Sequence, residues 1–169
     1  MACNPLLPPI PASEAELRAT FGDIRKYIRS DGTLNPSWEA EQIVRIMLPG
    51  PIPYAYGPKP ITKVTVHRKL ATGAKLLFAA IWERELVTAL VDYSGGFNFR
   101  PNRNNAAVLS LHAYGLAWDF GASAFPNGSK KRRNAELVQT FAEFGFRCGQ
   151  DFKGTPDPQH FSYATGAIG

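Results

Sequence analysis

Two stretches of the chain repeat apolar residues at the spacing of an amphipathic helix. The first contains Leu70, Ala74, Leu77, Phe78 and Ile81, and the second contains Leu137, Val138, Phe141 and Phe144. Residues three or four apart lie on one face of a helix, so each stretch predicts a helix with one buried face. Asn134 is a suitable N-cap for the second stretch, and Gly145 is a suitable residue just beyond its end.

A third helix is predicted near the N-terminus. Ser13 and Glu16 have the spacing of a capping box, in which a serine and a glutamate satisfy the first backbone N–H groups of a helix. Leu17, Phe21, Ile24 and Ile28 follow at helical spacing, and the turn residues 30–32 end the pattern. Residues 1–12 are rich in proline and are predicted to form an extended leader.

Strand patterns occupy shorter segments. Val64 and Val66 alternate with polar neighbours, residues 86–91 are predicted to form another strand, and 107–111 and 116–120 form two further strand pieces. The apolar segment 38–48, which ends at the turn residues 49–51, fits either a helix or a strand. Helices beside short strands, without a repeating strand–helix–strand order, predict an α+β domain with a small antiparallel sheet and flanking helices.

Composition narrows the class of protein. A chain of 169 residues with 44% hydrophobic and 20% charged residues predicts one folded domain, over residues 13–169, and excludes a disordered chain. Cys3 and Cys148 are too few for a disulfide framework, which favours a reducing compartment. The sequence has no apolar run of about 20 residues, and its first residues do not resemble a signal peptide. We therefore expect synthesis in the cytoplasm and no membrane span.

Positive charge gathers in one short segment. The formal net charge is +5, and Lys130, Lys131, Arg132 and Arg133 are consecutive. Such a run attracts polyanions, either nucleic acid or the phosphate-bearing polymers of a bacterial wall. The alternative is a solvated loop that contributes only to solubility.

Histidines and carboxylates suggest a metal site. Two of the three histidines lie close to aspartates, in the segments SLHAYGLAWDF and PDPQHF. Three ligands from His112, Asp119 and His160, with a fourth position left to water, would form a catalytic zinc site. Alternatively, the histidines could be ordinary core residues and the carboxylates ordinary surface residues, with no metal bound.

The spacing of these residues requires irregular backbone. His112 and Asp119 are seven residues apart and would point to opposite faces of one regular strand, so we expect a bend at Gly115. Prolines on both sides of Asp157 disfavour a helix there and predict a rigid turn. In such a turn Asp157 could accept a proton from zinc-bound water, whose pKa falls from about 16 to about 7.

Two motifs carry a resemblance to a known family. Ser110, His112, Gly115, Ala117 and Asp119 fit the motif SxHxxGxAxD, and Asp157, His160 and Phe161 fit a later D-x-x-H segment. The chain thereby resembles the zinc D-alanyl-D-alanine carboxypeptidases, a family that includes the L-alanyl-D-glutamate peptidases of phage endolysins. A weaker likeness extends over residues 37–163.

The resemblance implies a fold and a set of roles. The fold would be a compact α+β domain of the hedgehog and D-alanyl-D-alanine peptidase type, and one zinc ion would be held by His112, Asp119 and His160. Asp157 would be the general base, and Ser110 would support the ligands by hydrogen bonding rather than act as a nucleophile.

Other positions are less closely tied to the family pattern. Arg100 matches an arginine that faces the substrate carbonyl, although it could equally be a surface salt-bridge residue, with Arg103 as its rival. Relatives often carry Trp-Gly-Gly where this chain has Cys148 and its neighbours, so contacts with substrate differ there. We expect His67 to be structural and Cys148 to be a small buried hydrophobic residue.

Three functions remain open. The leading hypothesis is a monomeric endolysin-type peptidase that cleaves peptidoglycan stem peptides between L-alanine and D-glutamate, after it has been released to the wall. A D-alanyl-D-alanine carboxypeptidase is the second, although such an enzyme usually needs an export signal. A non-catalytic wall-binding module is the third, but a structural zinc would require a fourth protein ligand, Cys148 or Asp157.

Overall fold

The computed structural model describes residues 7–103 and 105–165. Its helices are α1 (Glu14–Phe21), α2 (Pro36–Gln42), α3 (Ala71–Glu83), α4 (Val87–Leu90) and α5 (Ala135–Glu143), with short 3-10 turns η1 (Ile24–Tyr27), η2 (Arg68–Leu70) and η3 (Leu111–Tyr114). Its strands are β1 (Ile43–Ile52), β2 (Ile61–His67), β3 (Tyr93–Gly95), β4 (Ala117–Phe120), β5 (Arg147–Gly149) and β6 (Asp157–Ser162). Cys3 and the first half of the proposed leader lie outside the described residues.

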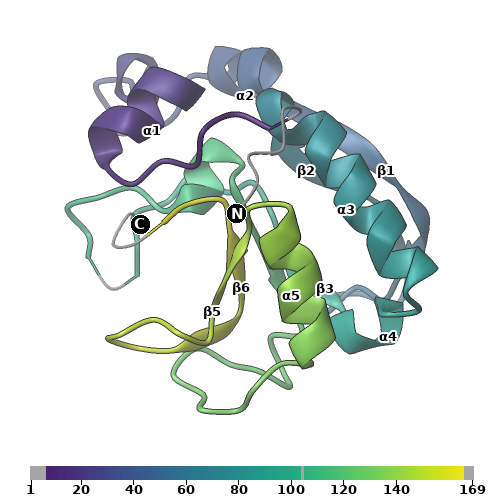
Figure 1. Cartoon of the computed structure of the whole chain (residues 1–169). Coiled ribbons are helices and arrows are strands. Elements are labelled where there is room, and N and C mark those ends of the chain that lie inside the picture. The colour runs from purple at the N-terminus through teal and green to yellow at the C-terminus, as the bar shows by residue number, and fades with distance from the viewer. Residues whose placement is uncertain (1–6, 104, 166–169) are drawn as a thin grey trace.

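The strands form two antiparallel sheets. β1 and β2 pair as a two-stranded sheet, and the second sheet has the order β3-β4-β6-β5. Helix α3 packs against β1 and α5, while α5 packs against β5 (Figure 1). This arrangement confirms the predicted compact α+β domain with small antiparallel sheets and flanking helices. Within the described residues, no helix has the length and hydrophobicity needed to cross a membrane.

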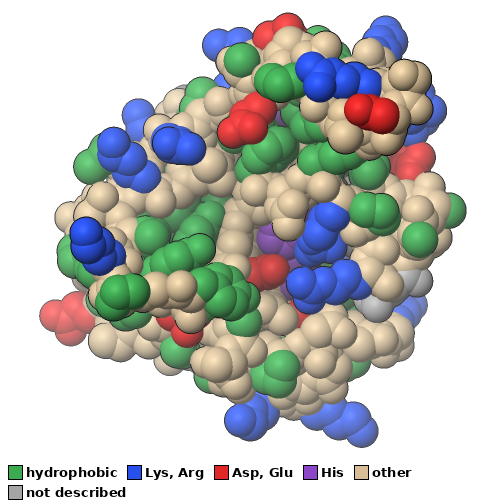
Figure 2. Space-filling view, turned by 180° about the vertical axis from the view of Figure 1, so that it is seen from behind, with side chains coloured by type: hydrophobic (Ala, Val, Ile, Leu, Met, Phe, Trp, Pro, Cys, Tyr) green, Lys and Arg blue, Asp and Glu red, His purple; other side chains and the backbone are tan. Residues whose placement is uncertain are grey.

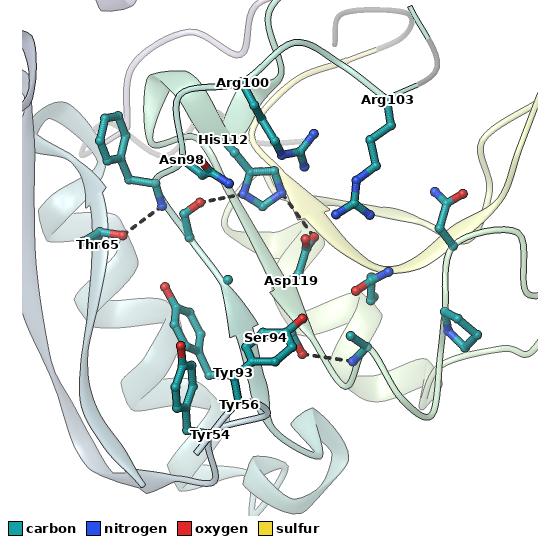
Figure 3. Close-up of a pocket in the computed structure, with 17 residues that line it drawn as sticks. Tyr54, Tyr56, Thr65, Tyr93, Ser94, Asn98, Arg100, Arg103, His112 and Asp119 are labelled. Atoms are coloured by element: carbon teal, nitrogen blue, oxygen red, sulfur yellow. Dashed lines mark hydrogen bonds and ion pairs between the residues drawn. The ribbon is translucent and has the colours of Figure 1, made fainter. Parts of the chain in front are cut away.

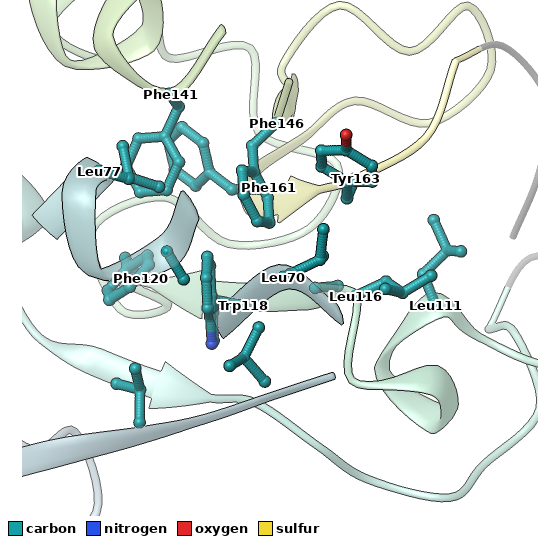
Figure 4. Close-up of a cluster of buried hydrophobic side chains, with 14 of the residues drawn as sticks. Leu70, Leu77, Leu111, Leu116, Trp118, Phe120, Phe141, Phe146, Phe161 and Tyr163 are labelled. Atoms are coloured by element: carbon teal, nitrogen blue, oxygen red, sulfur yellow. The ribbon is translucent and has the colours of Figure 1, made fainter. Parts of the chain in front are cut away.

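An aromatic core fixes β4 and β6 beneath α5 (Figure 4). The rings of Phe141 on α5 and Phe161 on β6 stack with centroids 4.0 Å apart, and Trp118 on β4 stacks on Phe146 at 4.8 Å. Each such pair contributes about 0.5–1.5 kcal/mol beyond the burial of its area. The strands that carry the candidate site residues are therefore held by aromatic packing.

The helix ends follow the predicted capping chemistry. Ser13 Oγ accepts a hydrogen bond from the Glu16 N–H at 3.2 Å, and Glu16 Oε2 accepts one from the Ala12 N–H at 2.7 Å. At the end of α5, Gly145 has a φ of 82°, which lets the Phe146 N–H reach the Phe141 carbonyl at 3.0 Å. Both ends match the sequence-based prediction.

Several predicted elements differ in the structure. The first helix ends at Phe21 because Gly22, with a φ of 96°, turns the chain into the separate η1. The segment predicted as a strand at 86–91 is the short helix α4, and 107–111 forms only one isolated bridge, between Leu109 and Pro101. The ambiguous segment 38–48 contains the end of α2 and the start of β1, and β1 continues through the predicted turn at 49–51.

The described part of the N-terminal segment lies along the end of the chain. The Thr165 N–H donates to the Pro11 carbonyl at 3.0 Å, and the Tyr163 hydroxyl donates to the Pro8 carbonyl. Residues 8–11 form no helix or strand. They are attached to the residues that follow β6 by these bonds.

Candidate metal centre

Three side chains converge beside β4 and β6. His112 Nε2 lies 3.2 Å from Asp119 Oδ1 and 3.2 Å from His160 Nδ1, and Asp119 Oδ1 lies 3.0 Å from His160 Nδ1. The three side chains are 2%, 13% and 8% exposed, in sequence order. The structure therefore brings together the three residues that the sequence analysis proposed as ligands.

The local backbone explains how they meet. Asp119 on β4 and His160 on β6 are direct partners in the antiparallel register, so their side chains share one face of the sheet. Ser110 caps η3 by accepting a hydrogen bond from the His112 N–H at 3.3 Å. Gly115, with a φ of 68°, then turns the chain from η3 into β4, as predicted. A side chain at Gly115 would collide with Ile43 and the backbone of His67.

The orientation of His112 is set by a backbone carbonyl. Its Nδ1 lies 2.7 Å from the Gly96 carbonyl oxygen, which can only accept a hydrogen bond. Nδ1 therefore carries the proton, and Nε2 is left as an electron-pair donor facing Asp119 and His160. This is the usual arrangement of a histidine that binds a metal.

Asp119 is held as a carboxylate. Burial raises its pKa, but hydrogen bonds with His112 and His160 outweigh that effect, and the net pKa lies well below the usual range. A buried anion placed between two imidazoles supplies the negative charge that a divalent cation requires.

The spacing of the three atoms matches a tetrahedral zinc site. Zinc bonds to nitrogen and oxygen are about 2.0–2.2 Å long, so two ligands at a tetrahedral angle are separated by about 3.3 Å. The observed separations are 3.0–3.2 Å. Two imidazole nitrogens and one carboxylate oxygen are suitable zinc donors, and a site with three protein ligands leaves a fourth position open.

The centre faces a cavity of about 770 Å³. His112 and Asp119 line it, and in the space-filling view histidine and acidic atoms lie inside a hollow with basic side chains on one side and hydrophobic ones on the other (Figure 2). The close-up shows Arg100 and Arg103 extending into this space, while Tyr54, Tyr56 and Tyr93 form the opposite wall (Figure 3).

Arg100 lies near enough to the candidate metal centre for the charge of Asp119 to act on it. Burial and the nearby Arg103 lower its pKa, whereas Asp119 and Asp157 act in the opposite direction, so Arg100 lies within electrostatic range of both carboxylates. Its Nη1 donates to the Pro101 carbonyl at 3.2 Å. Arg103, its rival in the sequence, lines the same cavity.

Asp157 stands at the start of β6 and not in the rigid turn that the flanking prolines predicted. Its Oδ1 is buried and has no hydrogen-bond partner within the described part of the chain. An unpaired buried carboxylate oxygen is unfavourable unless it accepts a hydrogen bond or binds a proton. Asp157 is separate from the cluster of three potential ligands.

The cationic run is only partly exposed. Arg133 is 4% exposed, and its guanidinium donates to the carbonyls of Phe120 and Ala89, each at 2.8 Å, while it lies over the Phe125 ring. Arg132 pairs with Asp151 at 2.6 Å. The prediction that Arg133 belongs to a polyanion-binding surface is wrong, because this side chain supports the fold.

His67 and Cys148 are both buried in the interior. His67 is fully buried and bonded through both ring nitrogens, as expected of a structural histidine. The Cys148 thiol points to the Pro158 carbonyl, and burial raises its pKa to about 11, so it stays protonated at neutral pH. Among the described residues, Cys148 is not part of the cluster of potential metal ligands, which agrees with Cys148 as a small buried residue.

Sequence reasoning missed the tyrosine wall and Gly96. Tyr54 and Tyr56 lie just beyond β1, and their rings meet edge to face at 5.7 Å. They reach the cavity only because the β1–β2 segment folds back toward β3. Nothing in the sequence indicates that the Gly96 carbonyl orients His112.

Comparison with known protein families identifies the class. A sequence model described as D-alanyl-D-alanine carboxypeptidase matches residues 103–163, the segment that contains His112, Asp119, Asp157 and His160. This match supports a peptidase. It agrees with the resemblance that the SxHxxGxAxD motif indicated, although the first hundred residues lie outside it. Comparisons with curated proteins and with solved structures gave no match.

Proposed function

We propose that the protein is a zinc peptidase that cleaves peptidoglycan stem peptides between L-alanine and D-glutamate. The observation that carries the proposal is the set of three donor atoms 3.0–3.2 Å apart, open to a cavity within a segment that matches a peptidase family. His112, Asp119 and His160 would hold one zinc ion. Bound zinc would act as a Lewis acid and would make water more acidic.

The chain's own residues account for the remaining chemistry. Asp157, whose Oδ1 is buried without a hydrogen-bond donor in the described residues, is suited to take a proton from the attacking water and pass it to the leaving amine. Arg100 can stabilise negative charge that develops on the carbonyl oxygen. Ser110 fixes the turn that carries His112.

The size of the cavity supports an endopeptidase. A volume of about 770 Å³ lies in the range that suits drug-sized ligands, which are larger than a terminal dipeptide of two alanines. Tyr54 and Tyr56, which are 38% and 68% exposed, extend the contact surface for neighbouring residues of a longer peptide. The second candidate, a D-alanyl-D-alanine carboxypeptidase, is favoured by the description of the matching family.

A non-catalytic wall-binding module is less well supported. A structural zinc normally has four protein ligands, and the cluster of potential ligands in the described residues includes neither Cys148 nor Asp157. We further propose that the protein is a monomer, made in the cytoplasm, that acts on the wall after release. The reduced, buried thiol of Cys148 is compatible with synthesis in that compartment.

Digestion of purified peptidoglycan tests the proposal. The zinc-loaded protein is incubated with the wall, and mass spectrometry identifies the new amino and carboxyl termini. We expect new amino termini at D-glutamate and new carboxyl termini at L-alanine. Release of free D-alanine would instead identify the carboxypeptidase, and the absence of new termini would identify the binding module.

Asp157→Asn tests the assignment of the general base. The change preserves size and removes basicity, so turnover should fall by about 10² to 10⁴-fold while zinc content and thermal unfolding persist. Near-normal turnover with full zinc would contradict the assignment. Loss of zinc as the main defect would make Asp157 a ligand instead.

A further inference from the structure

The charges that line the cavity do not balance. Arg100 and Arg103 line it, and Asp119 is the only acidic residue among the described residues that line it. Asp119 is already bonded to both histidines of the metal centre. A bound divalent cation would add to this positive excess. A concave site with such a charge concentrates anionic ligands.

The two arginines occupy different situations. Arg100 is partly buried and lies within electrostatic range of Asp119 and Asp157. Arg103, three residues after Arg100, is exposed and lies in the loop between β3 and η3. Within residues 7–103 and 105–165, no carboxylate forms an ion pair with Arg103.

Some other arginines of the described residues pair with carboxylates, and the exposed Arg29, Arg45 and Arg68, which do not, are not among the residues that line the cavity. Arg18, Arg25, Arg84 and Arg132 each contact a carboxylate at 2.6–2.8 Å. Arg103 instead extends into the cavity, on the wall opposite the tyrosines (Figure 3). An arginine held at the side of a substrate cavity without a protein carboxylate has its planar donor fork available for a ligand.

We propose that Arg103 is a specificity-determining residue that binds a free carboxylate of the substrate next to the scissile bond. The ligand class is an acidic peptide, and the corresponding carboxamide should be a poor substrate. The proposal rests on the proposed peptidase function and adds to it a requirement for charge. A carboxylate is favoured over a phosphate because the cavity also presents the amides of Asn98 and Gln159 and a wall of tyrosines, which suit a peptide.

The test uses two synthetic stem peptides that differ at one group. One carries a free carboxylate on the residue that follows the scissile bond, and the other carries a carboxamide there. The full-length, zinc-loaded protein is compared with Arg103→Gln, Arg103→Lys and Arg29→Gln. Arg29 is exposed and is not among the residues that line the cavity, so its variant loses the same charge elsewhere.

We expect the wild type to prefer the acid over the amide by about 10 to 100-fold in kcat/KM, the range of a charged hydrogen-bonded pair. Arg103→Gln should reduce this ratio to near 1 by slowing cleavage of the acid alone. Arg103→Lys should retain part of it, and Arg29→Gln should retain all of it. Unchanged thermal unfolding of Arg103→Gln establishes that the variant is folded.

Binding of both peptides, measured by calorimetry, separates the two hypotheses. Equal affinity of the wild type for acid and amide would overturn the role of Arg103, as would an acid preference that survives in Arg103→Gln. If acid is preferred through Arg103 but neither peptide is cleaved, the proposed peptidase function fails and the carboxylate site stands. Competition by inorganic phosphate as strong as that by the acid peptide would also overturn the proposal, since it would indicate a site for phosphate.

Discussion

Protonation of His67 should destabilise the fold at acidic pH. The ring is fully buried, Nε2 donates to the Phe21 carbonyl at 3.0 Å, and Nδ1 accepts from the Lys69 N–H at 3.2 Å. The neutral imidazole therefore forms a hydrogen bond through each of its two nitrogens. A proton added at Nδ1 would remove the acceptor for the Lys69 N–H and would place a positive charge in the core.

The expected magnitude follows from the pKa. Burial lowers the pKa of His67 from 6.5 to about 4, and the neighbouring Lys69 and Arg68 act in the same direction. Below about pH 6.5 the unfolded chain binds a proton that the folded chain rejects, so the free energy of unfolding falls as pH falls. The loss is complete near pH 4 and amounts to about 3 kcal/mol, because one pKa unit corresponds to about 1.4 kcal/mol.

Urea unfolding of metal-free wild type and His67→Gln measures this effect. Both proteins are unfolded at several pH values between about 7.5 and 4, and the difference between their unfolding free energies is plotted against pH. The two proteins differ only at residue 67, so the contributions of all other groups cancel in this difference. His67→Gln should be less stable at neutral pH but should lose less stability on acidification. Parallel pH profiles for the two proteins would refute the reasoning.

Three further outcomes test the metal centre and the surface. His112→Ala, Asp119→Ala and His160→Ala should each lose bound zinc by metal analysis, and full occupancy in all three would exclude them as ligands. Gly96→Ala should destabilise the fold by about 1–3 kcal/mol and weaken zinc binding, because the new methyl group would meet the Tyr93 hydroxyl and Thr65 Oγ1 beside the carbonyl that orients His112. Thermal unfolding with zinc titration checks this, and unchanged zinc affinity would contradict it. Replacing the exposed Lys130 and Lys131 with glutamine should weaken sedimentation with purified wall at low salt and leave turnover of a soluble peptide intact; a collapse of that turnover would place them in the active site.

Helices were the most predictable elements. α3 and α5 were recognised because their apolar spacing extends over several turns, and the Asn134 cap and Gly145 define α5. The segment 86–91 was misassigned because a short apolar run has no decisive period. In α4 it forms a single turn, with Val91 in a strained conformation at a φ of 72°.

The strand β6 shows a second limit of local reasoning. Prolines around Asp157 argued against regular structure, yet β6 includes Pro158. The β5–β6 register is irregular between Cys148 and Gly149, and Pro158 lies between the registered partners Asp157 and Phe161. Its missing N–H is tolerated at such an irregularity.

The site was predictable where a motif encoded it. His112, Asp119 and His160 were proposed from their residue types and from the family pattern, and the sheet register explains why two of them meet. The wall formed by Tyr54, Tyr56 and Tyr93 could not be predicted, because it depends on how one sheet folds against the other.

The metal centre and the cavity walls are built from different kinds of backbone. Asp119 and His160 stand on paired strands under an aromatic core, whereas Tyr54, Tyr56 and Arg103 come from connecting segments outside the strands. Connecting segments tolerate exchange and insertion better than packed strands do. Grafting a different loop over residues 102–109, which keeps Arg100, should therefore give new ligand preferences at an unchanged metal centre, which makes this scaffold suited to the engineering of altered specificity.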